Sequence, residues 1–105
     1  MILTKEEADA VTQAAVRQTA KKLNVMYAET SSAEVLLPQI EEIDPAAYER
    51  LTAFLEIYGE WFRAQTGDVK HGQDPLSPEE VLARVHALRV RRDETRATLD
   101  DWLRG

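Results

Sequence analysis

Apolar side chains recur along most of this chain at the three- and four-residue spacing of an α-helix. The spacing predicts three long amphipathic helices, over about 5–28, 45–66 and 78–103. A residue that can cap a helix precedes each of them: Thr4, Asp44 and Ser77. After Asp44 and Ser77 comes a proline, whose fixed φ suits the first helical position. The sequence therefore predicts an all-α fold, an antiparallel three-helix bundle.

A shorter apolar stretch lies between the first two of these helices. Ser31 and Glu34 have the spacing of a capping box, and Pro38 would interrupt a helix that starts there. We expect a short, kinked or two-piece helix across the end of the bundle. Its side chains at Leu36, Leu37 and Ile40 would plug the core. The fold prediction thus extends to up to four helices in a single domain over 1–105, with a loop at 67–75.

The predicted helix at 45–66 has an apolar arc of about half its circumference. So broad an arc is typical of a helix packed on more than one side, and we expect this one to be central. It also favours self-association, because an incompletely covered helix can complete its core with a second copy. We predict a homodimer or another protein partner, with Ile57, Trp61 and Trp102 as the possible interface. The aromatic residues of this helix are otherwise expected to be core.

Composition narrows the class of protein. The chain has 105 residues and a net charge of −6, so it repels nucleic acid overall. It contains no cysteine, which excludes disulfides and thiolate chemistry and is compatible with a reducing cytoplasm. No signal peptide is evident, and no apolar run reaches the ~20 residues of a membrane span. We therefore expect an acidic cytoplasmic protein that does not contact a membrane.

The apolar seam of the last helix is interrupted by arginine. Val81, Val85 and Leu88 predict an apolar residue at position 92, where Arg92 stands instead. An unpaired guanidinium is costly to bury, so Arg92 must pair, extend to solvent or face outward. A structural salt bridge is one interpretation. The other is a binding site for an anion or a carboxylate-rich partner, formed by three arginines at one-turn spacing: Arg89, Arg92 and Arg96.

Nucleic-acid binding through the same helix is a further alternative. Its basic residues are Arg84, His86, Arg89, Arg91, Arg92 and Arg96. Against this, Asp93 and Glu94 interrupt the run, the arginines spread around the helix, and no aromatic residues interleave to stack on bases.

Signals for catalysis or metal binding are weak. The two histidines, His71 and His86, lack the spacing of a zinc or di-iron site. The carboxylate pairs Glu6–Asp9 and Glu41–Asp44 are better explained by helix starts. We predict no catalytic residue, no metal and no cofactor.

Three functions remain open from the sequence. The first is a non-enzymatic helical module for protein–protein interaction or assembly, the second a nucleic-acid-associated regulator, and the third a small-anion binder or enzyme with a pocket near Arg92 and the tyrosines. No motif identifies a substrate.

Overall fold

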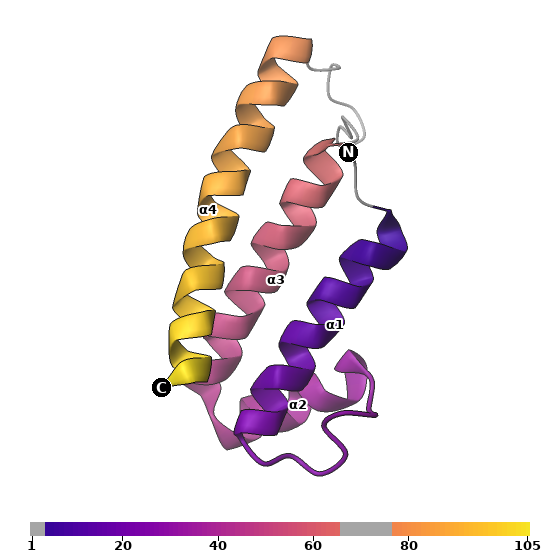
Figure 1. The fold of residues 1–105 in the computed structure, drawn as a ribbon, viewed down its shortest axis with the longest axis vertical. Helices are drawn as coiled ribbons and strands as arrows, with labels where there is room; N and C mark the ends of the chain where they lie inside the picture. The colour runs from indigo at the N-terminus through magenta and orange to yellow at the C-terminus, as the bar shows by residue number, and fades with distance from the viewer. Residues whose placement is uncertain (1–3, 66–76) are drawn as a thin grey trace.

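The computed structural model describes residues 4–65 and 77–105, and these form four α-helices. The helices are α1 (Lys5–Lys22), α2 (Ala33–Ile43), α3 (Pro45–Gln65) and α4 (Pro78–Arg104). Figure 1 shows that α1 and α4 run in one direction and α3 runs in the other, so α3 is antiparallel to both neighbours. The predicted all-α bundle with a short extra helix is confirmed.

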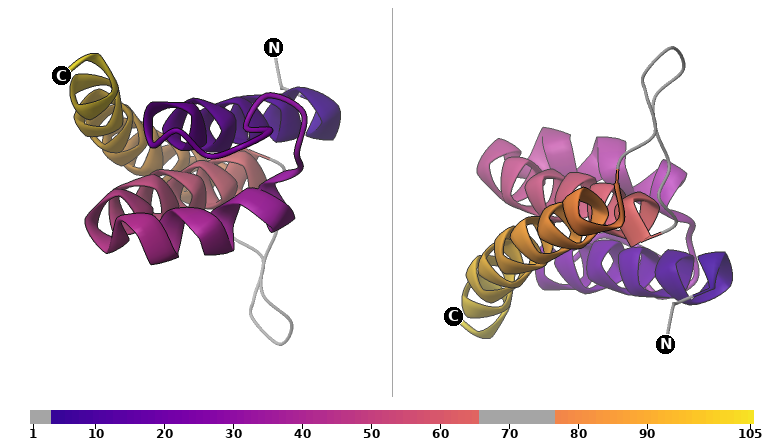
Figure 2. Two further views of the ribbon diagram at one scale, coloured as in Figure 1. Left: turned by 90° about the horizontal axis from the view of Figure 1, so that it is seen from below. Right: turned by 90° about the horizontal axis from the view of Figure 1, so that it is seen from above.

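Helix α3 is the centre of the bundle, as its broad apolar arc predicts. It packs on α4, α2 and α1, whereas α1 and α4 touch each other only sparsely. The end-on views in Figure 2 place α2 on one side of α3 and α4 on the other. The largest fully buried side chains come from all four helices: Phe54, Leu36, Ile40, Leu51, Leu99, Val16 and Thr19.

The predicted caps hold the starts of the long helices. The Thr4 hydroxyl accepts a hydrogen bond from the Glu7 amide at 3.1 Å. Asp44 and Ser77 do the same for the amides three residues on, at 3.2 Å in each case. Each bond satisfies an amide that has no partner inside the helix. The predicted loop at 67–75 lies outside the described residues.

The first helix ends earlier than predicted, at Lys22 rather than near 28. Asn24 takes a left-handed conformation with φ of 60°, which asparagine tolerates better than most residues. The amide of Val25 then bonds to the Ala20 carbonyl at 3.0 Å, as in a Schellman motif. Met26 and Tyr27, which helical spacing places on the buried face, therefore lie beyond the helix and are each 73% exposed.

Helix α2 is one continuous element, so the two-piece alternative is wrong. Pro38 has no amide hydrogen, so a single intrahelical hydrogen bond is missing there. The side-chain amide of the next residue, Gln39, donates to the Val35 carbonyl at 3.0 Å. The helix lies across the end of the bundle where α1 ends (Figure 1). Leu36 and Ile40 are fully buried, as expected of side chains that plug the core.

The predicted capping box at Ser31 does not form. Helix α2 begins after Ser32, whose side chain makes no capping bond. The Ala33 amide instead donates to Oε1 of Gln13 on α1 at 3.2 Å. One turn further along α1, Arg17 Nε donates to the Ser31 carbonyl at 3.1 Å. The start of α2 is thus fixed by side chains of another helix, which local sequence spacing cannot reveal.

Replacing Gly59 with alanine is expected to stabilise the protein by about 0.5–1 kcal/mol. Gly59 lies inside α3, where alanine is a better helix former because it loses less backbone entropy. A Cβ there would meet Nη1 of Arg63 at 3.2 Å, so the end of this long side chain has to shift by a few tenths of an ångström. Urea unfolding measures the change, and a destabilised Gly59→Ala variant would show that Arg63 cannot move.

Candidate interaction surface on the last helix

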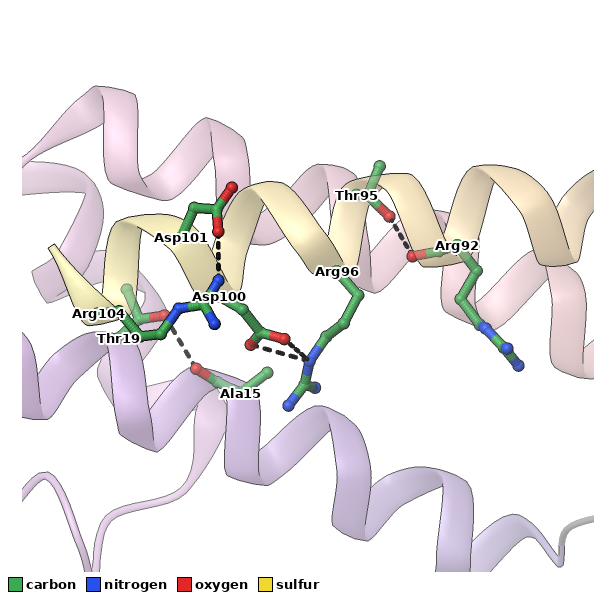
Figure 3. Close-up of polar contacts among 8 residues, drawn as sticks. All are labelled: Ala15, Thr19, Arg92, Thr95, Arg96, Asp100, Asp101 and Arg104. Carbon is green, nitrogen blue, oxygen red and sulfur yellow. Dashed lines mark hydrogen bonds and ion pairs between the residues drawn. The ribbon is translucent and has the colours of Figure 1, made fainter.

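Two arginines of α4 lie over the aromatic side chains of α3. The guanidinium carbon of Arg92 is 4.2 Å from the centre of the Trp61 ring, and that of Arg96 is 5.4 Å from the Phe54 ring. Each also pairs with a carboxylate of its own helix: Arg92 with Asp93 at 2.7 Å and Arg96 with Asp100 at 3.1 Å. Figure 3 shows both arginines projecting from the same side of α4.

These contacts explain how arginine occupies a seam position. The Arg92 side chain is 20% exposed, so its stem is largely buried while its charge is held by Asp93 and the face of an indole ring. Arg92 therefore pairs rather than facing outward, and Arg96 behaves similarly over Phe54. The structural interpretation accounts for both side chains without a ligand.

Arg89 is not part of this arrangement. It is exposed, and it has no ion pair among the described residues. The structure thus brings Arg92 and Arg96 together over α3 and leaves Arg89 on the surface. The three do not present free guanidinium groups to a common anion.

The phenol of Tyr58 lies in the same region. Its ring centre is 5.6 Å from that of Phe54 and 5.3 Å from that of Trp61. Burial raises the pKa of Tyr58 above its ordinary value, and the positive charge of Arg92 opposes part of that rise. The neutral phenol is therefore the form that the fold favours.

This shift predicts a loss of stability at high pH. Tyr58 contributes to the free energy of unfolding through this raised pKa. The contribution is fully present below pH ~10, the pKa of an unfolded tyrosine, and is lost as the pH rises through the higher folded pKa. We expect the slope of unfolding free energy against pH above 10 to be shallower in Tyr58→Phe than in the wild type. Urea unfolding across pH 8–11 measures it, and identical slopes would contradict the shift.

The predicted interface residues are mostly inside the monomer. Ile57 and Trp61 are only 7% and 6% exposed, so the monomer does not present these two side chains, and their place in an interface stays a prediction. The reason is that α1, α2 and α4 together cover the broad apolar arc of α3. Trp102 is partly buried, with Lys22 Nζ 4.9 Å and the Arg50 guanidinium carbon 5.2 Å from its ring centre.

Lys22 also caps the C-terminal end of α4. Its ammonium donates to the carbonyls of Trp102 and Leu103, in the last turn of that helix. A cation there complements the negative end of the helix dipole. This contact is one of the few between α1 and α4, and it holds the last turn of α4, which carries Trp102, against the end of α1.

A surface hollow of ≈ 710 Å³ lies between the ends of α1 and α4. Its lining carries four cations: Lys21, Lys22, Arg96 and Arg104. All are already engaged, because three pair with carboxylates of this chain and Lys22 bonds to the α4 carbonyls. Each cation of this hollow therefore already has a partner within the chain. Arg92 lines neither it nor the hollows along α1, beside the loop after α1, and between α3 and α4.

The outward face of α4 over 82–91 combines exposed apolar residues with arginines, unlike the hollow described above. Leu82 is 70% exposed and Val90 is 45% exposed, and Ala83 and Ala87 on the same side are exposed as well. At about 100° per residue, these four lie on an arc that points away from the buried seam. The exposed His86 lies between Leu82 and Val90 on this arc. Three exposed arginines border the arc, Arg89 along one edge and Arg84 and Arg91 along the other. We call this surface the α4 outward face.

The arginines of the α4 outward face have no carboxylate partner within the part of the chain that the structure describes. None of the three forms an ion pair with a described residue, in contrast to Arg92, Arg96 and Arg104. The first turns of α4 also extend past the end of α3 in Figure 1. The sequence pattern gave no prediction of this surface, because the predicted apolar seam is the one that packs inward. The available signal was Leu82 and Val90, two large apolar residues that lie off that seam.

The described residues contain no group of three or more His, Cys, Asp or Glu side chains placed to hold a metal ion. His71 lies outside the described residues, and His86 is exposed on α4. Within 4–65 and 77–105, no helix has the length and apolar character needed to cross a membrane.

Comparison with known proteins adds no relative: no protein-family model, no curated protein and no solved structure matches this chain.

Proposed function

We propose that this chain is a non-enzymatic protein–protein interaction module that binds through the α4 outward face. The observation that carries the proposal is the exposure of Leu82 and Val90, at 70% and 45%, between arginines that have no carboxylate partner among the described residues. The cytoplasmic location expected from the sequence is part of the same proposal.

The chemistry of this face suits a protein partner. Burial of a leucine or valine side chain contributes about 1.5–3 kcal/mol, a gain that requires an apolar surface on the other side. Arginine is enriched in protein interfaces because its guanidinium pairs with carboxylates and its stem packs on apolar groups. An apolar centre with charged edges is also the arrangement by which helices select partners in coiled coils.

Nucleic-acid binding is the second candidate, and the exposed Arg84, Arg89 and Arg91 favour it. It predicts affinity that falls steeply with salt and is abolished by Arg89→Glu/Arg91→Glu. Arg92 is unsuitable for this test, because its stacking on Trp61 would confound binding with stability. Fluorescence anisotropy with labelled duplex and single-stranded DNA measures the effect. Binding unaffected by both the substitutions and salt rules this candidate out.

The proposed function is tested by comparing affinity capture from lysate with three baits. These are the wild type, Leu82→Glu/Val90→Glu, and Met26→Glu as a control, since Met26 is 73% exposed but lies in the loop after α1. We expect the same stoichiometric protein with the wild type and the control and its loss with the α4 variant. All three should melt at similar temperatures, because exposed positions change stability little. Capture that survives Leu82→Glu/Val90→Glu contradicts the proposal.

A further inference from the structure

Helix α2 presents a surface of opposite charge to the α4 outward face. It contains no lysine or arginine, and its three glutamates are Glu34, Glu41 and Glu42. Two of its apolar residues are only half covered: Val35 is 52% exposed and Ile43 is 54% exposed. The glutamates form no ion pair with any described residue. We call this surface the α2 acidic face.

The two faces match in length as well as charge. Helix α2 has 11 residues and is about 16 Å long, and the segment 82–91 of α4 is about 15 Å long. Each offers two exposed apolar residues. Between 82 and 91, α4 carries no acidic residue and three arginines that have no carboxylate partner among the described residues. Placed side by side, the faces would pair carboxylates with guanidinium groups along an apolar centre.

The two faces cannot meet within one molecule. Helices α2 and α4 lie on opposite sides of α3 in both views of Figure 2, and they make no contact with each other. A partner with the chemistry of the α2 acidic face is thus available only from another chain. A second copy of this protein is one such chain.

We infer that the α4 outward face of one copy docks on the α2 acidic face of a second copy. This inference rests on the proposed function and gives the same face a further, weaker partner, a second copy of this chain. The contact is heterologous, because each copy uses a different surface and keeps its other surface free. Association therefore continues from dimers to larger species as concentration rises, rather than stopping at a symmetric dimer.

The contact is small, which sets the conditions for observing it. Two helices in contact over about 15 Å bury less than the ~1,000 Å² expected of a stable complex, so the association is weak. Its charge pairs are exposed and are screened at high ionic strength. We expect the mass-average molecular weight to rise at millimolar protein in about 10 mM salt, and to return to the monomer value in 0.5 M salt.

A charge-swap experiment tests this pairing. One variant, Arg89→Glu/Arg91→Glu, reverses the α4 outward face, and the other, Glu41→Lys/Glu42→Lys, reverses the α2 acidic face. All four residues are exposed, and circular dichroism would verify that each variant folds. Each variant alone has two faces of like charge and is expected to stay monomeric by light scattering. Their equimolar mixture restores opposite charges at both contacts and is expected to associate.

The controls separate this pairing from general charge effects. Lys5→Glu/Arg104→Glu introduces the same charge change as the α4 variant at exposed positions outside both faces, and it should associate like the wild type. Association of Glu41→Lys/Glu42→Lys alone would overturn the inference, because the α2 acidic face would then not be the partner of α4. A mixture that stays monomeric, or a wild type that stays monomeric in low salt, would overturn it as well.

The same data separate this inference from the proposed function. If self-association is absent but capture of a foreign protein still depends on Leu82 and Val90, the second copy is the wrong partner and the interaction module stands. If capture also fails to depend on these residues, both proposals fail.

Discussion

Replacing Phe54 with alanine is expected to destabilise the protein by about 3–5 kcal/mol. Phe54 is 1% exposed at the centre of α3, so the substitution removes buried apolar surface and leaves a cavity. It also removes the ring under the Arg96 guanidinium and the aromatic contact with Tyr58. Because a domain of this kind is stable by only about 5–15 kcal/mol, such a loss is a large part of the total.

Phe62 provides the matched control. It is the same residue type on the same helix, but it is only partly buried. Phe62→Ala should therefore cost clearly less than Phe54→Ala when both are measured by urea unfolding. Equal losses would show that the centre of the core lies elsewhere than the structure places it.

Replacing Leu36 with alanine is expected to cost about 2–5 kcal/mol. Leu36 is fully buried although it belongs to the shortest helix, which lies across the end of the bundle. The loss would show that α2 is an integral part of the core and not an appendage. This matters for the proposed self-association, because the α2 acidic face would then be held rigidly on the core.

Val35 is the control for this second prediction. It is the neighbouring residue on α2 and is 52% exposed, so Val35→Ala should change stability by less than about 0.5 kcal/mol. Guanidinium unfolding of both variants measures the difference. A small effect for Leu36→Ala would mean that α2 is not packed into the core as described.

The fold was predictable from the sequence because its signals are local. Caps at Thr4, Asp44 and Ser77 act over three residues, and helical spacing identifies the buried faces. The end of α1 was missed because the spacing continues past Asn24, while the backbone turns there with a positive φ. Gln13 and Arg17, which hold the start of α2, act across separate helices and leave no local pattern.

The candidate site was less predictable, because the role of an arginine depends on what lies opposite. Arg92 and Arg96 interrupt the seam in the sequence, yet α3 supplies aromatic rings beneath both of them. Arg84, Arg89 and Arg91 look the same in sequence, but they face solvent. Only the packing of α4 on α3 separates the first pair, which stabilises the fold, from the three arginines proposed to bind a partner.

Site-specific photo-crosslinking tests most directly whether the α4 outward face is a binding surface. A photoreactive amino acid would replace Leu82 in one version of the protein and Met26 in another, since these side chains are 70% and 73% exposed and lie on different surfaces. We expect irradiation of lysate to give a discrete protein adduct from position 82 and none from position 26. An adduct from position 26 alone, or the same adducts from both positions, would contradict the assignment of this face.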